Sequence, residues 1–274
     1  MTVYIQQLPV AGSGDVLYPD AAMDAGTACL VDLVDDWAWG GAVPADGDDL
    51  DGQSILNYAM ADDGWNETPG AVSTGGIVGD GTGGAVFSAS EQYLTLPVGF
   101  CPPVGATKFG FIIWVASSAY NVASSVNNTT FSIAPASGIT GIIGMFPGYS
   151  GGVITSVGVN GLGFNAGTPA WVAPFQSGQM HQYSFEFDMT VGGTSYLRTY
   201  LDGAAASTFT IASGAAVSST YTRPIVGRHP SYNGQGFKGR FTRALMEMSG
   251  TPGARPFAET VALDYSRNSA RLAV

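Results

Sequence analysis

The sequence predicts an all-β protein built as a two-sheet antiparallel jelly-roll sandwich with little helix. Three observations lead to this prediction. Glycine accounts for 39 of the 274 residues, about twice its average share, and it often stands in short clusters of the kind that tight turns use. Short stretches rich in β-branched and aromatic residues alternate with these clusters. Few windows of the chain have a helical period.

The length and charge of the chain limit what it can bind. A chain of 274 residues can bury a large core without disulfides or metals. Charged residues make up only 11% of the sequence, and the formal net charge is −11. Binding to nucleic-acid phosphates or to anionic membranes needs a basic surface, so we expect neither partner. The sequence has no run of about 18 apolar residues, so we expect no membrane insertion.

Residues 1–70 differ from the rest of the chain. They contain twelve aspartates and no lysine or arginine, together with the tryptophans Trp37, Trp39 and Trp65. An acidic segment with apolar pieces predicts an extended N-terminal arm or subdomain that packs on something else, such as a neighbouring chain. The first ten residues have no basic region and no long apolar run, so we expect no secretory signal.

Residues 71–255 are expected to form the sandwich. Tyr183, Phe185 and Phe187 alternate with polar residues, which is typical of a strand with one buried face. Many short antiparallel strands separated by turns indicate a sandwich or a barrel. The expected strands are Ala85–Ser88, Tyr93–Leu96, Lys108–Ala116, Thr129–Ile133, Gly141–Met145, Val153–Val159, His181–Met189, Tyr196–Leu201, Ala206–Ile211, Arg223–Val226 and Gly236–Ser249.

The last segment, residues 256–274, is expected to be a separate C-terminal tail. Phe257, Val261 and Ala262 could line one face of a short helix over Pro256–Tyr265. A strand and a second arm remain alternatives for this tail.

Seven segments of the predicted sandwich follow the order and spacing of a known family. They are Ala85–Ser88, Gln92–Pro97, Phe109–Trp114, His181–Phe185, Tyr196–Gly203, Ile225–Arg228 and Phe237–Phe241. Together they resemble the laminin-G-like, concanavalin A-like jelly roll, over roughly residues 71–249. In that family Asp202-Gly203 would make a tight hairpin turn. The acidic leader looks like leaders of such domains in bacteriophage structural proteins. The resemblance implies a fold and not a function.

Glu186 and Asp188 are the first candidates for catalysis. Glycoside hydrolases of this fold place several carboxylates at alternate positions of one strand, where they can act as nucleophile and general acid. No second glutamate follows Asp188. We therefore expect Glu186 and Asp188 to lie on an exposed strand face without a catalytic role; a partner carboxylate from another strand is the alternative.

We expect no catalytic residues and no cofactor. The aspartates of Asp46–Asp51 resemble a calcium loop, but the required glycine and final glutamate are missing; a looser structural calcium site is the alternative. His181 and His229 form no zinc pattern, and no Gly-x-Ser-x-Gly turn points to a serine triad. Cys29 and Cys101 are too few for a disulfide framework, and we expect two reduced thiols.

Four aromatic residues are the candidates for an interface. Trp37 and Trp39 belong to the acidic arm, and Trp171 and Phe175 stand in a loop-like stretch with prolines. Aromatic side chains on loops can anchor a protein contact or stack on sugars.

These observations favour a non-enzymatic structural protein of a bacteriophage virion, such as a capsid decoration, tail-associated or fibre-type component. Its partners would be other virion proteins and further copies of itself, in a particle assembled in the host cytoplasm. A carbohydrate-binding module that recognises cell-surface glycans is the first alternative. A glycoside hydrolase of the concanavalin A-like fold is the second.

Overall fold

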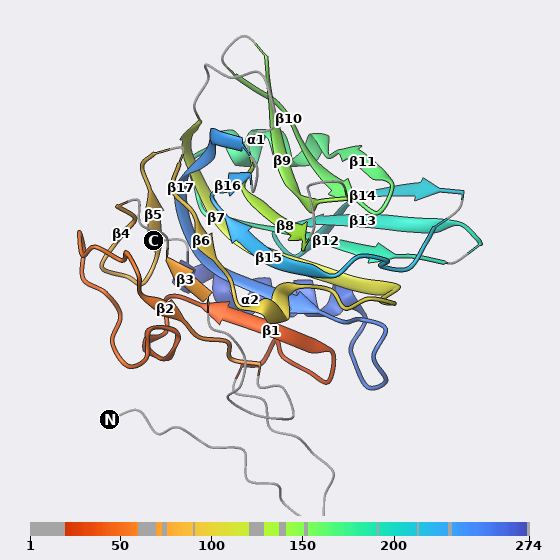
Figure 1. Cartoon of the computed structure of the whole chain (residues 1–274), viewed down its shortest axis with the longest axis horizontal. Helices are drawn as coiled ribbons and strands as arrows, with labels where there is room; N and C mark the ends of the chain where they lie inside the picture. Colours follow the sequence, from red (N-terminus) through yellow and green to blue (C-terminus); the bar gives the residue numbers. More distant parts are fainter. Residues whose placement is uncertain are drawn as a thin grey trace, which may run out of the picture.

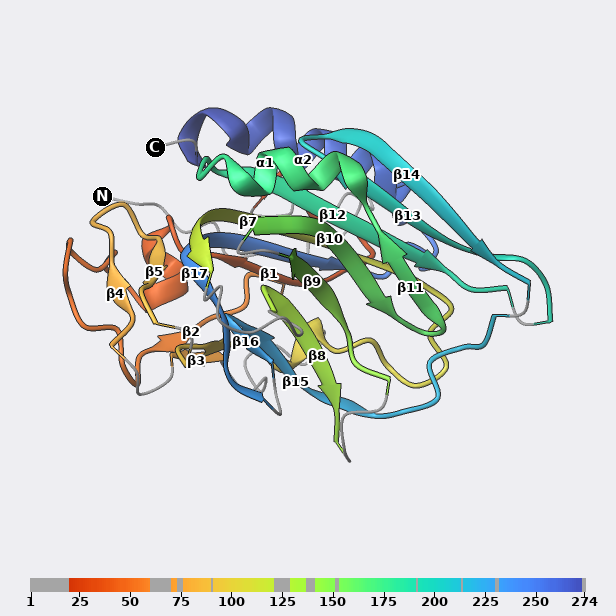
Figure 2. The same ribbon diagram turned by 90° about the horizontal axis from the view of Figure 1, so that it is seen from above.

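Two antiparallel sheets pack face to face and enclose one main core (Figures 1 and 2). The structure, a computed structural model, describes residues 20–59, 70–72, 76–89, 91–120, 129–136, 141–150, 153–190, 192–212, 214–229 and 232–272. The predicted all-β sandwich is confirmed.

The first sheet has nine strands, and its longest members are central. In spatial order it contains β14 (Ala204–Ile211), β13 (Ser195–Leu201), β12 (His181–Asp188), β7 (Lys108–Tyr120), β17 (Tyr232–Glu247), β5 (Ala85–Phe87) and β4 (Val78–Gly79), while β1 (Thr27–Asp32) and β16 (Arg228–His229) also pair with β17.

The second sheet has eight strands and lies against the first. In spatial order it contains β11 (Phe164–Gly167), β10 (Val153–Gly161), β9 (Ile143–Ser150), β8 (Phe131–Pro135), β15 (Tyr221–Val226), β6 (Leu94–Thr95), β3 (Gly70–Val72) and β2 (Ser54–Ile55). The short helices η1 (Asp36–Trp39), η2 (Val98–Phe100), η3 (Pro169–Trp171) and α1 (Val172–Gln176) lie in the connections, and α2 (Phe257–Leu272) follows the last strand.

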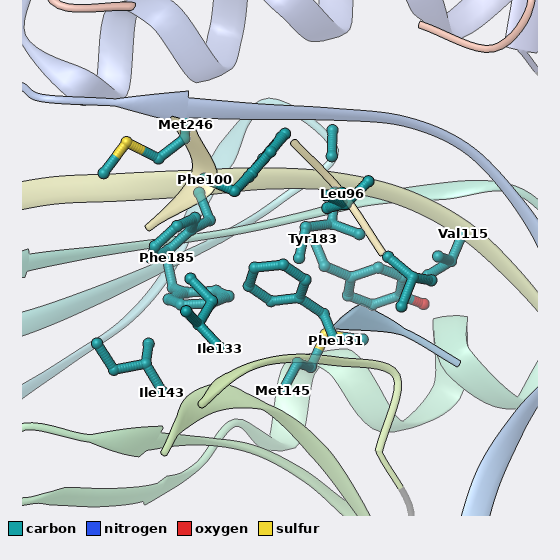
Figure 3. Packing of buried hydrophobic residues seen from close by; sticks show 14 of the residues in the cluster. Leu96, Phe100, Val115, Phe131, Ile133, Ile143, Met145, Tyr183, Phe185 and Met246 are labelled. Atoms are coloured by element: carbon teal, nitrogen blue, oxygen red, sulfur yellow. The ribbon is translucent and has the colours of Figure 1, made fainter. Parts of the chain in front are cut away.

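The core between the sheets is rich in aromatic rings. Phe131 from the second sheet lies 5.4 Å, centroid to centroid, from Phe111 and 6.4 Å from Phe185 of the first sheet. Figure 3 shows Phe131, Phe185 and Tyr183 meeting between the two layers. Buried aromatic pairs of this kind add about 0.5–1.5 kcal/mol each beyond the area that they bury.

Part of the predicted N-terminal arm belongs to the sandwich. β1 pairs with β17 in the first sheet, and β2 pairs with β3 in the second. Leu33 and Leu50 are fully buried in the main core. The predicted boundary at residue 70 is therefore wrong for residues 20–59; residues 1–19 and 60–69, including Trp65, lie outside the described residues.

The C-terminal tail is a helix, one of the alternatives predicted for it. α2 lies along the outer face of the first sheet (Figure 2). Gly110 lets it approach, because a Cβ there would lie 2.5 Å from the ring of Phe257. We call this side the covered face. The residues of α2 that are buried against it recur at helical spacing: Phe257, Thr260, Val261, Asp264, Asn268 and Leu272.

A buried polar network joins α2 to the covered face. Asp264 is fully buried and accepts hydrogen bonds from Trp114 Nε1 (2.7 Å), Gln182 Nε2 (2.9 Å), Asn268 Nδ2 (3.0 Å) and Arg243 Nε (2.8 Å). A buried charge is tolerated only when it is paired and hydrogen-bonded. Here both oxygens of the carboxylate are satisfied.

Arg243 extends this network to the start of the chain. Its side chain is 0% exposed, and it pairs with Asp32 (2.5 Å) and Asp20 (3.1 Å) as well as Asp264. Arg271 also pairs with Asp32. Burial alone would raise the pKa of Asp32, but Arg243 and Arg271 lower it overall. The acidic N-terminal segment is therefore paired with arginines of β17 and α2. These pairs compensate its negative charge, so β1 can lie in the sheet although residues 1–70 contain no lysine or arginine.

Candidate functional site

The outer face of the second sheet is the side turned away from α2 (Figure 2). Strand register places one residue from each of six neighbouring strands in a row across it. Their chain neighbours Leu94, Phe131, Ile143 and Val159 point into the core, so alternation directs the row outward. We call this side the open face. Its row is Thr95, Ile225, Ser132, Gly144, Asn160 and Asn165.

Four residues of the row are polar, and the other two are Ile225 and Gly144. Asn165 is exposed and Thr95 and Asn160 are half-buried. Asn160 and Asn165 are directly opposite each other on β10 and β11. The Ser132 hydroxyl is buried and has no hydrogen-bond partner in the described residues. The amides of Asn160 and Asn165 and the Thr95 hydroxyl are donors and acceptors that a polar ligand can use.

Aromatic side chains lie two residues along the strand from two members of the row, Tyr93 from Thr95 and Phe146 from Gly144. The guanidinium of Arg228 lies 4.2 Å from the ring centroid of Tyr93, a cation–π contact. The rings of Phe146 and His229 are 6.2 Å apart. Burial lowers the pKa of His229 and so favours its neutral imidazole. The half-buried Phe146 offers an apolar ring beside the polar row.

Such a face suits a polar, ring-shaped ligand. Sugars present hydroxyl groups to amides and hydroxyls, and their apolar faces stack on aromatic rings. Among the described residues, no group of three or more histidines, cysteines, aspartates or glutamates is arranged to hold a metal ion.

The aspartates of the Asp46–Asp51 loop stabilise their own turns. Asp48 Oδ2 accepts from the main-chain N–H of Ala45 at 2.7 Å, and Asp49 Oδ1 accepts from that of Asp51 at 3.0 Å. Aspartate side chains commonly satisfy turn N–H groups in this way.

Glu186 and Asp188 are not on a free strand face as predicted. Glu186 is buried and binds Arg198 Nη1 (3.1 Å) and the Ser249 hydroxyl (2.9 Å), while Asp188 binds the same Arg198 at 2.8 Å. The prediction failed because the outer side of β12 is covered by neighbouring segments. This arrangement is an ion pair that ties β12 to β13.

Two of the four predicted interface residues are core residues. Trp171 is 0% exposed and Phe175 is 1% exposed. Both rings pack edge-to-face on Tyr183, at centroid distances of 5.3 and 5.4 Å. The segment resembles a loop in sequence, but η3 and α1 turn its aromatic rings inward. Trp171 and Phe175 are therefore unavailable to a partner.

The other two tryptophans are half-buried. Trp39 donates from Nε1 to the Leu33 carbonyl at 2.7 Å. Trp37 packs on Tyr58 at 4.4 Å and, with Leu56, lines an open hollow. Of the predicted interface residues, Trp37 is the one whose ring borders a surface hollow.

A second constellation, which the sequence did not predict, lies at one end of the sandwich. His181 Nδ1 is 2.7 Å from Asp202 Oδ2, and His181 Nε2 is 3.3 Å from the Ser177 hydroxyl. Asp202 and Gly203 form the predicted two-residue hairpin turn, with φ of 48° and 81°. The pairing of Tyr183 with Leu201 brings that turn beside His181. The sequence predicted the Asp-Gly turn, but not the register of β12 and β13 that brings the turn beside His181.

Cys29 is buried and Cys101 is half-buried. No helix in the described part of the chain is long and apolar enough to span a membrane.

Solved structures share this architecture. Domain 4 of AbnA, an extracellular GH43 arabinanase from Geobacillus stearothermophilus, in complex with arabinotriose, matches with a TM-score of 0.54 and 16% identity over 88% of this chain and 98% of that one. Trypanosoma rangeli sialidase in complex with sialic acid matches with a TM-score of 0.54 and 11% identity over 92% of this chain and 34% of the sialidase. The chain shares the jelly-roll β-sandwich fold of these structures.

At sequence identities this low, the two matches support a shared fold and no shared function. The chain spans about a third of the sialidase's length. No protein-family model matches the chain, and no curated protein matches its sequence.

Proposed function

We propose that this jelly roll is a carbohydrate-binding module and that the open face holds the sugar. The observation that carries the proposal is the difference between the two outer faces. α2 occupies the covered face, whereas the open face presents Asn160, Asn165 and Phe146 with partly or fully exposed side chains. The sugar complexes of the arabinanase domain and of the sialidase motivate glycans as the ligand class.

Glycan-array screening followed by calorimetry with the best ligand tests this proposal. Losing one amide contact should cost about 0.5–1.5 kcal/mol, so we expect Asn160→Ala and Asn165→Ala each to weaken binding by up to about tenfold. Phe146→Ala removes the stacking ring and should weaken binding by a similar factor.

Thr210→Ala is the matched control, because Thr210 is an exposed polar residue on β14 of the other sheet. Its affinity should equal that of the unmodified protein. An array without any bound glycan, or binding that survives all three open-face substitutions, would contradict the proposal.

Binding without glycosidic cleavage is part of this proposal. The carboxylates of Glu186 and Asp188 are held by Arg198, and Glu186 is buried, so this pair does not face a substrate. Release of free sugar from a bound glycan, lost in Glu186→Gln, would favour the glycoside hydrolase alternative instead.

A second candidate is a structural role in a bacteriophage virion, with other virion proteins and further copies of the chain as partners. The hollow beside Trp37 supports it, because a half-buried tryptophan next to open apolar surface is a common anchor at interfaces. Light scattering of the purified chain tests self-association: Trp37→Ser should shift an oligomer toward the monomer, and an unchanged mass would remove Trp37 from the interface. A glycan-binding face and a virion contact can coexist on one molecule.

A further inference from the structure

Ser177, His181 and Asp202 have the order of contacts that activates a serine. Ser177 follows α1, His181 begins β12, and Asp202 lies in the turn between β13 and β14. The hydroxyl faces one imidazole nitrogen at 3.3 Å, and the carboxylate faces the other at 2.7 Å. A nucleophile, a base and a group that orients the base are the three parts of such a site.

The carboxylate fixes the imidazole tautomer. Asp202 Oδ2 accepts from Nδ1–H of His181, which leaves Nε2 as the acceptor toward Ser177. Asp202 Oδ1 accepts from the main-chain N–H of Gln182 at 3.0 Å, so the carboxylate is held on both sides. Asp202 is thus a positioning residue, and His181 is the general base.

The Ser177 hydroxyl is accessible and polarised. Ser177 is exposed. Its Oγ donates to the Pro174 carbonyl at 2.6 Å and accepts from the main-chain N–H of Gln179 at 3.1 Å. Rotation about the Cβ–Oγ bond redirects the proton from Pro174 to His181. The N–H of Gln179 holds Oγ in place beside His181.

We propose that Ser177 is a nucleophile toward small carboxylic esters, with His181 as its base. Ser177 Oγ bonds to the acyl carbon while its proton passes to His181 Nε2. The ester C–O bond then breaks, and the alcohol leaves with that proton. Water, deprotonated by His181, then bonds to the acyl carbon, the bond from that carbon to Ser177 Oγ breaks, and His181 returns the proton to Oγ as the carboxylic acid leaves. Because Ser177 lies on the exposed surface, the substrate is a short acyl group such as acetyl.

Covalent labelling of the full chain with a fluorophosphonate probe tests this nucleophile directly. We expect one labelled site, identified as Ser177 by peptide mass spectrometry, and no labelling of Ser177→Ala. His181→Gln should slow labelling by about a hundredfold or more, as loss of a general base does, and Asp202→Asn should slow it through the wrong tautomer. Release of p-nitrophenol from p-nitrophenyl acetate should follow the same order.

Ser266→Ala is the matched control. Ser266 is also exposed and, like Ser177, donates to the carbonyl three residues before it, here at 2.8 Å. Among the described residues, it makes no hydrogen bond to a histidine. Labelling should be unchanged in this variant. Labelling that is absent from the unmodified protein, or that persists in Ser177→Ala, overturns the proposal and leaves the His181–Asp202 contact as a tie between β12 and the hairpin.

A pH series on the unmodified protein covers the case in which His181→Gln fails to fold. Labelling should fall in acid, where a protonated imidazole cannot accept from Ser177. Asp202 and Tyr183 are titratable side chains in contact with His181. Burial raises the pKa of Tyr183, so its hydroxyl stays neutral. A flat profile contradicts the role of His181. This test is independent of glycan binding at the open face.

Discussion

The two outer faces of this sandwich satisfy their polar groups in opposite ways. On the covered face, Arg243 of β17 and Asp264 of α2 lie between the sheet and the helix without access to water, and each is bonded to protein partners. On the open face, Asn160 and Asn165 keep access to solvent. A polar group that is enclosed must be paired within the chain, and one that is left accessible can be paired by a ligand. The difference shows which face is available for recognition.

The largest loss of stability is expected when one partner of the buried polar network on the covered face is removed. Asp264→Ala leaves Arg243 buried with less charge compensation and should lower the free energy of unfolding by about 3–5 kcal/mol. Urea denaturation followed by tryptophan fluorescence measures it. Asp188→Ala, which loses a pair with the partly exposed Arg198, should cost about 1 kcal/mol or less. Equal losses of unfolding free energy in the two variants would contradict the distinction between buried and partly exposed ion pairs.

A smaller effect is expected from the glycine that admits α2. In Gly110→Ala the new methyl group would meet the Phe257 ring, so the helix or the ring must shift, at a cost of about 1–3 kcal/mol. Gly167 of the second sheet has nothing within 4 Å of its would-be Cβ, and Gly167→Ala should stay within about 0.5 kcal/mol of the unmodified protein. Thermal unfolding of both variants compares the two sheets. A tolerant Gly110 would mean that α2 packs loosely.

A further test concerns the carboxyl group of Glu247, which is buried on the covered face. Burial, with a contribution from Asp24, raises the pKa of Glu247 to about 9. The folded protein keeps this proton while the unfolded chain releases it near pH 4.5. Stability from Glu247 is therefore complete in acid and declines from about pH 4.5 to pH 9, by at most about 1.4 kcal/mol per pH unit.

Glu247→Gln removes this titration while keeping the shape of the side chain. We expect the variant to be matched with the unmodified protein in mild acid and to become the more stable of the two as the pH rises toward 8. Glu259→Gln, at an exposed position in the first turn of α2, should retain the original pH slope. Parallel stability curves for Glu247→Gln and the unmodified protein would show that Glu247 is ionised when folded.

Much of the sandwich could be predicted because its strands carry local signals. Every strand predicted from the sequence overlaps an observed one, and Phe185 and Phe187 point inward as their alternation indicates. β2, β4 and β16, of two residues each, are too short for a periodic pattern. β1 was missed because its acidic surroundings suggested an arm, and its neutralising arginines lie more than 200 positions away.

The candidate sites depend on register, and register is a property of the whole sheet. Asn160 and Asn165 are ordinary residues in the sequence and become part of a face only when six strands are aligned. Ser177 and His181 are close in sequence, but Asp202 joins them through the β12–β13 pairing. Trp171 and Phe175 were predicted to lie at an interface and are buried instead. Composition alone cannot tell whether the rings of a short helix point outward or inward.

The ion pairs that bridge Asp32 to Arg243 and Arg271 have a consequence for how the protein is made. They span 211 and 239 positions of the chain, so β1 stays without its sheet neighbour until β17 has left the ribosome. Contacts of such long range slow folding, and the nascent acidic segment must remain soluble in the meantime. Its negative charges, which repel one another until those arginines emerge, keep early chains from associating.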